Sequence, residues 1–481
     1  MSTATAASSS SPNFPLFGVS LAYLEKHSEK NPAWTTADFC EHHVKQVTLQ
    51  SKTSLAEHLV AAQPELVKPV AEVFVSHAWQ YNFAKLVAAL KQTQDRFVWL
   101  DVVCVNQHRT ARDFPEQWWY ETFASALRAI GRAEIVLAPW NDPLPSRRSW
   151  CIYEIQECVK QSLETHIRMF PEEEVSFKAA MKKGETGQAF YRNMFTNIDV
   201  MNGRAFFEND EKVIRSLVQK AGPKQVNDLV LKPIKAWLVQ VSDRAWEESS
   251  LPLERSGVAY SKAYLHKVLG ELDMAEEWFN RAISLARDSQ TRIGLELSLA
   301  DALRAMGASR QNDAMETYSR ALAQAQEAND LASEAHALHG QGCIEMSRGN
   351  LAQAEPLLQK CLAIRKSQGQ ENADLAQIHG SLGRLFTDMN RLEEARPLLI
   401  QSLAMRQKIL GDAHVDSAQA LLNLSDLAIK ENNMEWAKSL RKQALEIRER
   451  ALGEVCFLFD NGESFQLTPL LLFYLTISCT L

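Results

Sequence analysis

The sequence predicts two kinds of structure in one chain: an α/β domain built on a parallel sheet, followed by an all-helical solenoid. Two observations lead to this fold class. Between residues 71 and 242, short and fully apolar segments alternate with amphipathic ones, which is typical of βαβ units. Between residues 255 and 453, one pattern of small residues recurs five times, which indicates stacked repeats. The 481 residues have room for both.

Composition narrows the classes of function. The net charge is −7, and Lys and Arg are mixed with acidic residues rather than gathered in stripes, so no nucleic-acid partner is expected. None of the eight cysteines forms a Cys-x-x-Cys pair, which is typical of reduced thiols in a cytoplasmic protein. The apolar end TPLLLFYLTISCTL has 14 residues, fewer than the ~20 of a membrane helix, so no membrane association is expected.

The first 70 residues divide into two parts. Residues 1–13 are small and polar without a basic region, so we interpret them as a disordered leader rather than a targeting signal. Residues 14–70 predict a helical extension, with Thr35 and Ser54 as candidate helix caps. The trio Cys40, His42 and His43 does not predict a metal site, because adjacent histidines on a helix point to different sides.

Four apolar segments between residues 71 and 242 are expected to form strands: AEVFVSHAW, RFVWLDVVCV, EIVLAPW and HIRMF. Strands that are apolar on both faces indicate a buried parallel sheet, and such sheets bind ligands at the carboxyl ends of their strands. His77, Asp101, Trp140 and the segment around Trp150 follow these strands, so we expect them to converge there. A buried Asp101 would need a partner, which favours a role in the cleft.

The repeats begin near residue 255, after an expected linker at 243–254. Successive units carry a small residue at Ala275, Ala314, Ala354, Ala395 and Ala437, which are 39, 40, 41 and 42 residues apart. A second small residue follows seven positions later, at Ala282, Ala321, Cys361, Ser402 and Ala444. Each unit has room for two helices, and small residues two turns apart let neighbouring helices pack closely. No structure is predicted for the apolar tail at 454–481.

The last unit, LGDAHVDSAQALLNLSDLAIKENNMEWAKSLRKQALEIRERALG, resembles a tetratricopeptide repeat of the kinesin-light-chain type. The resemblance covers residues 255–453, although the first two units lack the Gly-x-x-His turn. It implies a superhelix whose concave face binds a protein or peptide, with Ser381 and Asn423 as peptide-binding residues. The alternative is that Asn423 only holds its helix pair together. A role as a motor cargo adaptor would also require heptads before the repeats, and none are present.

The segments VFVSHAW, LRAIGRAEIVLAP and SWCIYEI, in this order, resemble the Toll/interleukin-1 receptor (TIR) domain, which has a flavodoxin-like fold. FVWLDVVCVNQ is similar to the heterokaryon-incompatibility (HET) domains of the same superfamily. These matches cover residues 72–160, with weaker likeness to about residue 240. The first loop, Ser76 to Trp79, departs from the Phe-Arg-Gly of plant TIR domains.

In the TIR domains that hydrolyse NAD, the glutamate of the Trp-Cys-x-x-Glu motif is catalytic, so the resemblance places this role on Glu154. A carboxylate there would stabilise positive charge on the ribose, and a helix dipole would keep it ionised. The expected substrate-binding residues are His77, Trp79, Asp101, Trp140 and Arg148. The resemblance thus implies NAD as the substrate, and neither a further cofactor nor a metal is expected. Two alternatives stay open: a scaffold that only associates with other TIR domains, and a Glu154 that is merely a first-turn helix acid.

Two cysteines of this region are expected to pack rather than react. Cys104 is placed in an apolar strand, and Cys151 lies near a helix start next to Trp150, so both predict buried thiols. Cys151 and Cys158 lack the further ligands of a zinc site.

The overall prediction is therefore an effector in which partner binding by the repeats brings TIR-like domains together and switches on NAD cleavage.

Overall fold

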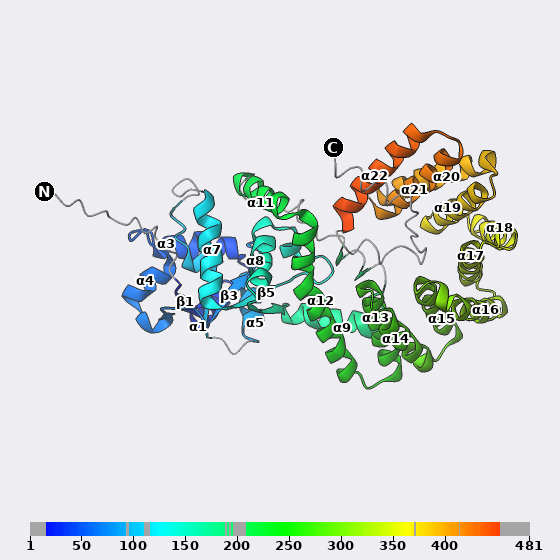
Figure 1. Cartoon of the computed structure of the whole chain (residues 1–481). Helices are drawn as coiled ribbons and strands as arrows, with labels where there is room; N and C mark the ends of the chain where they lie inside the picture. Colours follow the sequence, from blue (N-terminus) through cyan, green and yellow to red (C-terminus); the bar gives the residue numbers. More distant parts are fainter. Residues whose placement is uncertain are drawn as a thin grey trace. The chain divides into compact units, whose positions relative to one another are not determined.

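The computed structural model describes residues 16–92, 96–109, 116–187, 190–191, 194–195, 208–369, 372–412 and 414–452 (Figure 1). It divides the chain into two compact units: residues 1–179 with 194–240, and residues 180–193 with 241–481. The expected leader at 1–13 and tail at 454–481 lie outside the described residues. No helix in the described ranges is long and apolar enough to cross a membrane.

The first unit is built on a mixed sheet with the strand order β2-β1-β4-β3-β5-β6. In the described residues its strands are β1 Gly18–Ser20, β2 Val67–Lys68, β3 Val73–Ser76, β4 Phe97–Trp99, β5 Arg132–Val136 and β6 Glu164–Arg168. The last four are parallel, as the alternation of strand and helix segments predicts, although β5 and β6 also contain charged residues. β1 is antiparallel to both of its neighbours. The four predicted strands are therefore present, and the sheet extends beyond them.

The extension at 14–70 contains the expected helices but is not only helical. Thr35 and Ser54 each cap a helix in a reciprocal capping box, with Asp38 and Glu57 as the acidic partners. The helical segments are α1 Leu21–Lys30, α2 Thr36–Phe39, a π-helical turn Cys40–Val44, α3 Lys45–Val47 and α4 Leu55–Ala62. The prediction was wrong in omitting β1 and β2, because strands of three and two residues are too short to show an alternating pattern.

The remaining helices of the first unit lie between and after the parallel strands in the chain, and α7 and α8 pack against these strands. They are α5 Phe83–Leu90, α6 Asp101–Cys104, α7 Glu116–Ile130, α8 Ser149–Lys160, α9 Pro171–Lys182, α11 Glu208–Ala221 and α12 Pro223–Glu248, of which α9 and α12 continue into the second unit. The expected long strand RFVWLDVVCV ends at Trp99, so Cys104 lies in a helix and not in a strand. The Asp101 carboxylate accepts a hydrogen bond from the Val102 amide at the start of this helix. The sequence could not show the helix, because a short apolar segment is equally compatible with a buried helix and a buried strand.

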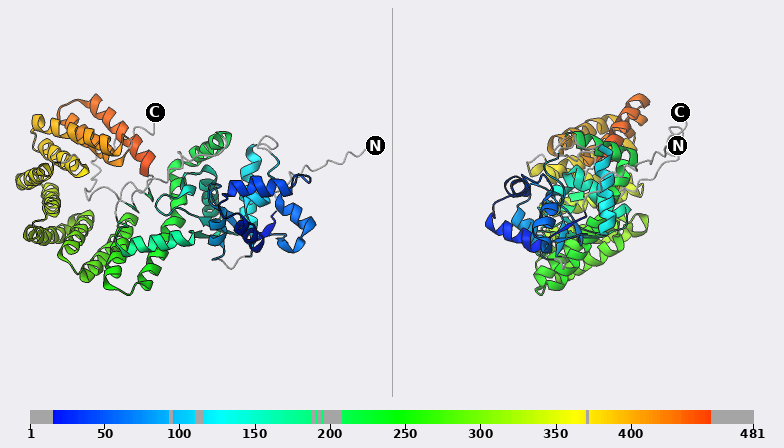
Figure 2. Two further views of the ribbon diagram at one scale, coloured as in Figure 1. Left: turned by 180° about the vertical axis from the view of Figure 1, so that it is seen from behind. Right: turned by 90° about the vertical axis from the view of Figure 1, so that its left-hand side faces the viewer.

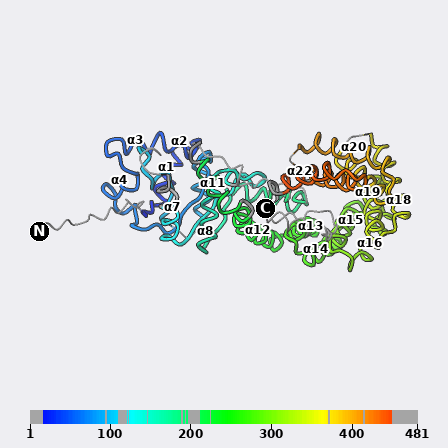
Figure 3. The backbone as a smooth tube through the Cα atoms, turned by 45° about the horizontal axis from the view of Figure 1, so that its top comes forward, coloured from blue at the N-terminus to red at the C-terminus, as the bar shows by residue number. Residues whose placement is uncertain are grey.

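The second unit is a solenoid of five helix pairs within the described residues. They are α13 Pro252–Leu269 with α14 Leu272–Leu285, α15 Ser289–Ala305 with α16 Gln311–Glu327, α17 Leu331–Ser347 with α18 Leu351–Ser367, α19 Ala373–Asp388 with α20 Leu392–Leu410, and α21 Val415–Lys430 with α22 Met434–Leu452. The pairs follow one another along an arc (Figures 2 and 3). All ten small residues used to find the repeats are buried, which confirms the repeat register.

Close helix packing explains why the repeats need small residues. A Cβ on Gly342 would lie 2.7 Å from the Leu358 side chain, and one on Gly383 would lie 2.5 Å from the Leu399 side chain. Each contact joins the first helix of a pair to its second helix. The apolar side chains of the last three pairs form one continuous core, as expected when stacked repeats share their buried faces.

The start of the solenoid includes a segment that the sequence placed in the α/β domain. The Thr186 hydroxyl donates to Ser261 Oγ at 2.6 Å, and the Tyr191 hydroxyl lies 2.7 Å from the same atom. A Cβ on Gly257 would lie only 2.1 Å from the Lys182 carbonyl oxygen, so glycine is needed for this approach. Residues 243–254, expected as a linker, instead hold the end of α12 and the start of α13.

Candidate functional site

The carboxyl ends of β3 and β4 bring several of the expected site residues together. Ser76 ends β3, and His77 follows it. The Cys151 thiol of α8 donates to the His77 carbonyl oxygen at 3.4 Å. Asp101 begins α6 after β4, and its Oδ2 accepts the Trp79 indole N–H at 2.7 Å. His77, Trp79 and Asp101 therefore converge at one edge of the sheet, next to α8.

Glu154 is a buried acid on α8. It is 7% exposed, and burial raises its pKa to about 8; the Ser76 hydroxyl lowers this pKa by less, and Asp101 raises it. The carboxyl is therefore mostly protonated at neutral pH. The expectation of a dipole-ionised, first-turn acid was wrong, because α8 begins at Ser149 and places Glu154 in its second turn. Desolvation exceeds the effect of the dipole there.

His77 and Asp101 form a loose pair at the same edge. His77 Nε2 lies 3.9 Å from Asp101 Oδ1, and this buried nitrogen has no hydrogen-bond partner in the described part of the chain. Burial lowers the pKa of His77, the Asp101 charge opposes this, and nearby Arg148 lowers it further. The imidazole is therefore neutral at pH 7. The Asp101 side chain keeps 30% exposure, so it is the solvent-facing member of the pair.

Trp140 does not join this group. Its indole N–H donates to Ser176 Oγ at 3.3 Å, and its ring lies 5.2 Å from the Phe177 ring, both on α9. Its main-chain amide donates to Glu173, also on α9. Arg148 precedes the first residue of α8 and is close enough to influence the pKa of both His77 and Cys151.

The thiols behave as packing residues. Burial raises the pKa of Cys151 and of Cys104 well above the usual thiol value, which keeps both protonated and unreactive. The Trp150 ring packs 5.4 Å from the Phe123 ring, so this end of α8 is anchored by side-chain packing. Among the described residues, no group of three or more His, Cys, Asp or Glu side chains is arranged to hold a metal.

The two residues predicted to bind a peptide lie on the solenoid and make hydrogen bonds there. Ser381 and Asn423, the two predicted peptide-binding residues, lie on the first helices of the fourth and fifth pairs. The Ser381 hydroxyl is 2.9 Å from His339 Nε2 on α17. Asn423 Oδ1 accepts from Gln419 Nε2 at 3.1 Å, one turn earlier on the same helix. Asn423 makes no hydrogen bond to the second helix of its pair, within the residues described.

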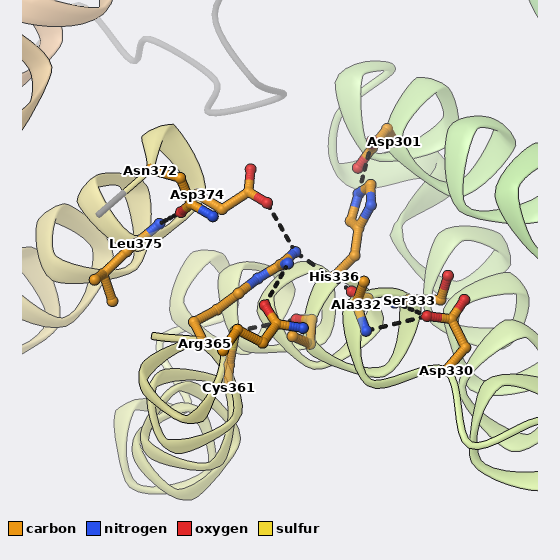
Figure 4. Close-up of polar contacts among 12 residues, drawn as sticks. Asp301, Asp330, Ala332, Ser333, His336, Cys361, Arg365, Asn372, Asp374 and Leu375 are labelled. Atoms are coloured by element: carbon orange, nitrogen blue, oxygen red, sulfur yellow. Dashed lines mark hydrogen bonds and ion pairs between the residues drawn. The ribbon is translucent and has the colours of Figure 1, made fainter. Parts of the chain in front are cut away.

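Figure 4 shows a charged cluster on the middle repeats that the sequence did not predict. His336 Nε2 lies 3.1 Å from Asp301 Oδ2, which joins α17 to α15. Arg365 of α18 pairs with Asp374 of α19 at 3.0 Å and donates to the Ala332 carbonyl. Burial opposes ionisation of Asp301 and His336, but their mutual attraction lowers the pKa of Asp301 and raises that of His336.

A sequence signal for part of this cluster exists. Arg365, Arg406 and Arg448 follow the second small residue of their repeats by four residues each. All three reach the first helix of a pair: Arg365 bonds to Ala332, Arg406 to the Asp416 carbonyl and Arg448 to Gln419. Asp301, which pairs with His336, has no such recurrence, so only the structure could reveal it. His339 and His379, on the first helices of the third and fourth pairs, are buried, and burial lowers the pKa of both.

Comparisons with known proteins identify the repeats. Tetratricopeptide repeat models match residues 257–289, 335–367 and 374–450, all within the solenoid. Similar solved structures include BtubC (BKLC) from P. vanneervenii, at 19% identity over 45% of this chain and 88% of that one, with a TM-score of 0.36. A putative kinesin light chain from Podosopora anserina with nearly identical TPR-like repeats matches at 19% identity over 42% and 97% of the two chains, TM-score 0.32.

A Rap protein solved in complex with competence and sporulation factor matches at 14% identity over 60% of this chain and 79% of that one, TM-score 0.38. No curated protein matches the sequence. The chain therefore contains tetratricopeptide repeats, preceded by an α/β unit with a six-stranded mixed sheet in its described part.

Proposed function

We propose that this is a two-part signalling protein in which the repeats bind a protein partner and the α/β unit acts as a TIR-like effector. The partner binds on the concave face, as is usual for stacked helical repeats. The observation that supports partner binding by the repeats is Asn423, a buried residue whose amide nitrogen makes no hydrogen bond in the described residues. This nitrogen is not among the fully buried, unpartnered polar atoms of the described residues, so it stays accessible to a ligand that accepts a hydrogen bond from it.

The proposed effector activity is supported by the residues at the carboxyl ends of the parallel strands in the first unit. The parallel strands stand in the order second, first, third, fourth along the chain, which is the order of flavodoxin-like sheets. In such sheets the ligand lies where the order reverses, here at the ends of β3 and β5. Glu154, His77 and Asp101 meet at the end of β3, and this meeting carries the proposal of NAD hydrolysis by self-associating copies.

The chemistry needs few groups. The bond between ribose C1 and the nicotinamide nitrogen breaks, and nicotinamide leaves with the electron pair. Water adds to the ribose carbon and releases a proton, which gives ADP-ribose. An ionised Glu154 carboxylate would stabilise the positive charge that develops on the ribose. Because burial raises the pKa of Glu154 to about 8, only about a tenth of the sites are ionised at pH 7, and the rate should rise with pH.

The decisive experiment follows free nicotinamide while the full chain, dilute or clustered by a multivalent tag, is incubated with NAD. Loss of release in Glu154→Gln, with retention in Glu157→Gln, supports the catalytic role. Glu157 is a suitable control because it lies one turn further along α8 and pairs with Lys160 at 3.1 Å. Absence of release from clustered protein that still self-associates would refute the enzyme.

Two alternatives remain as proposals. In the first, the TIR-like unit is a scaffold that only associates with other copies, and the protonated Glu154 is a packing residue. In the second, the repeats carry cargo in the manner of a kinesin light chain, which rests on the repeat type alone. Binding of a motor subunit without self-association of the first unit would favour the second alternative.

A further inference from the structure

The loop between β3 and α5 is held in place by the N-terminal extension. Residues 77–82 form this loop and carry Trp79, one of the expected substrate-binding residues. The extension reaches the loop with residues 32–37, the clamp segment, which contains the start of α2. An antiparallel bridge pairs Thr35 with Asn82, so the clamp segment and the end of the loop run side by side.

The first amide groups of α2 bond to the loop. Amides in the first turn of a helix have no partner inside the helix and need an acceptor elsewhere. The Thr36 amide donates to the Tyr81 carbonyl at 2.9 Å, and the Ala37 amide donates to the Trp79 carbonyl at 3.1 Å. The capping box described above fixes the start of this helix. The main chain at Trp79 is therefore positioned by the extension.

Asn82 adds a side-chain bond to the clamp segment. Its amide nitrogen donates to the Pro32 carbonyl at 2.7 Å, and its side-chain oxygen accepts the Lys85 amide at 3.0 Å. Asn82 therefore caps α5 and holds the extension at the same time. The Phe83 amide, which follows it, donates to the Trp34 carbonyl at 2.8 Å. Bonds thus join the clamp segment to the loop and to the start of α5.

The sheet fixes the loop from the other side. The Tyr81 hydroxyl accepts the Ala138 amide at 2.9 Å and donates to the Ala138 carbonyl at 2.8 Å, just beyond β5. The Trp79 indole N–H donates to Asp101, which follows β4. With its N–H and its main-chain carbonyl both bonded, the half-buried Trp79 ring is held in one orientation. An indole held in this way can stack on a planar ring of a ligand.

We propose that the clamp segment is part of the effector site: it fixes the Trp79 ring as a platform on which an aromatic ring of NAD stacks, with Thr36 and Asn82 as positioning residues. The inference deepens the effector function proposed above and rests on it. A ring that is fixed before the ligand arrives loses little further freedom on binding, so the clamp segment adds to the affinity. The extension thereby completes the ligand site, besides adding two strands to the sheet.

Substitutions that each remove one bond of the clamp segment test this in the full chain. Glu154→Gln is the parent, so that NAD binds without being cleaved, and calorimetry measures its affinity. Asn82→Asp keeps the cap of α5 but cannot donate to Pro32. Thr36→Pro suits the first position of a helix but lacks the amide that bonds Tyr81. Each should weaken NAD binding about fivefold, as is usual for the loss of one hydrogen bond.

Two comparisons separate a positioning role from a structural one. Glu25→Gln removes an ion pair between the extension and Lys91, just past the other end of α5, so it should leave the NAD affinity unchanged. In a Trp79→Ala background, Asn82→Asp should cause no further loss of affinity, as expected when one residue acts through the other. Melting temperatures confirm that the variants fold.

Each other outcome overturns a distinct claim. Absence of NAD binding by both the wild type and Glu154→Gln would overturn the proposed NAD site, and this inference with it. An NAD affinity equal to that of the parent in both Asn82→Asp and Thr36→Pro would overturn the inference alone. A further loss when Asn82→Asp is added to Trp79→Ala, or an equal loss in Glu25→Gln, would show that the extension only supports the fold.

Discussion

Replacement of Gly340 by alanine is expected to destabilise the middle of the solenoid. A Cβ at this position would lie 2.2 Å from Tyr318 Cζ and 2.5 Å from Cε1, in the face of a ring that is fully buried. Ordinary carbon contacts need about 3.5 Å, so the ring must move by roughly 1.3 Å. The Tyr318 hydroxyl donates to Asp301, which also pairs with His336, so the movement breaks a bond to a half-buried carboxylate.

The magnitude follows from three effects. Overpacking costs about 1–3 kcal/mol, and loss of a hydrogen bond to a charged group costs about 1.5–3 kcal/mol. Alanine in place of glycine inside a helix stabilises the helix by about 1 kcal/mol, which offsets part of this loss. These effects overlap because the ring can relax, and we expect a net loss of about 2–4 kcal/mol. Gly294→Ala on α15 has no clash and should stabilise its helix by about 1 kcal/mol.

Hydrogen exchange of the full chain measures the loss of stability in the individual helices around Gly340. In Gly340→Ala, peptides from α16 and α17 should exchange roughly 30-fold to 700-fold faster than in the wild type, since 1.4 kcal/mol is about a factor of ten. Peptides from β3 and β5 serve as an internal reference and should not change. Equal protection of α16 and α17 in Gly340→Ala and Gly294→Ala would refute the packing argument.

Three further predictions concern the buried Glu154, the half-exposed His336 and the close backbone contact at Gly257. Because burial raises the pKa of Glu154 from 4.5 to about 8, the stability it contributes is present below pH 4.5 and is lost as pH rises through 8. Glu154→Gln should abolish this slope in the thermal melting of the full chain, and an unchanged slope would contradict the prediction. Asp301 outweighs the desolvation of His336 and raises its pKa above 6.5, so this contribution is present below pH 6.5 and is lost at higher pH. Hydrogen exchange of α17 at pH 6 and pH 9, corrected for intrinsic rates, should show the loss in the wild type but not in His336→Gln. Gly257→Ala places a Cβ 2.1 Å from the Lys182 carbonyl, so trypsin should cleave after Lys182 faster than in the wild type, whereas unchanged resistance would show that the segment can shift.

The repeats could be predicted closely because their contacts are encoded in single residues. Ala354 and Cys361 are small and buried where helices meet, so the pattern of small residues directly records the packing. The helix caps at Thr35 and Ser54 were also predictable, because capping depends on residues three apart. By contrast, β1 and α6 are too short to show a period, and their conformations are set by neighbours in the sheet.

The sequence by itself determined the order of the two units, the register of the helix pairs and the convergence of His77 and Asp101 at the ends of parallel strands. These features follow from local periodicity and chain order. Only the tertiary structure decided the protonation of Glu154, the contacts of Trp140 with α9 and the pairing of His336 with Asp301. Burial, and hydrogen bonds between residues as distant as Arg448 and Gln419, depend on which elements pack together, and no local pattern in the chain records this.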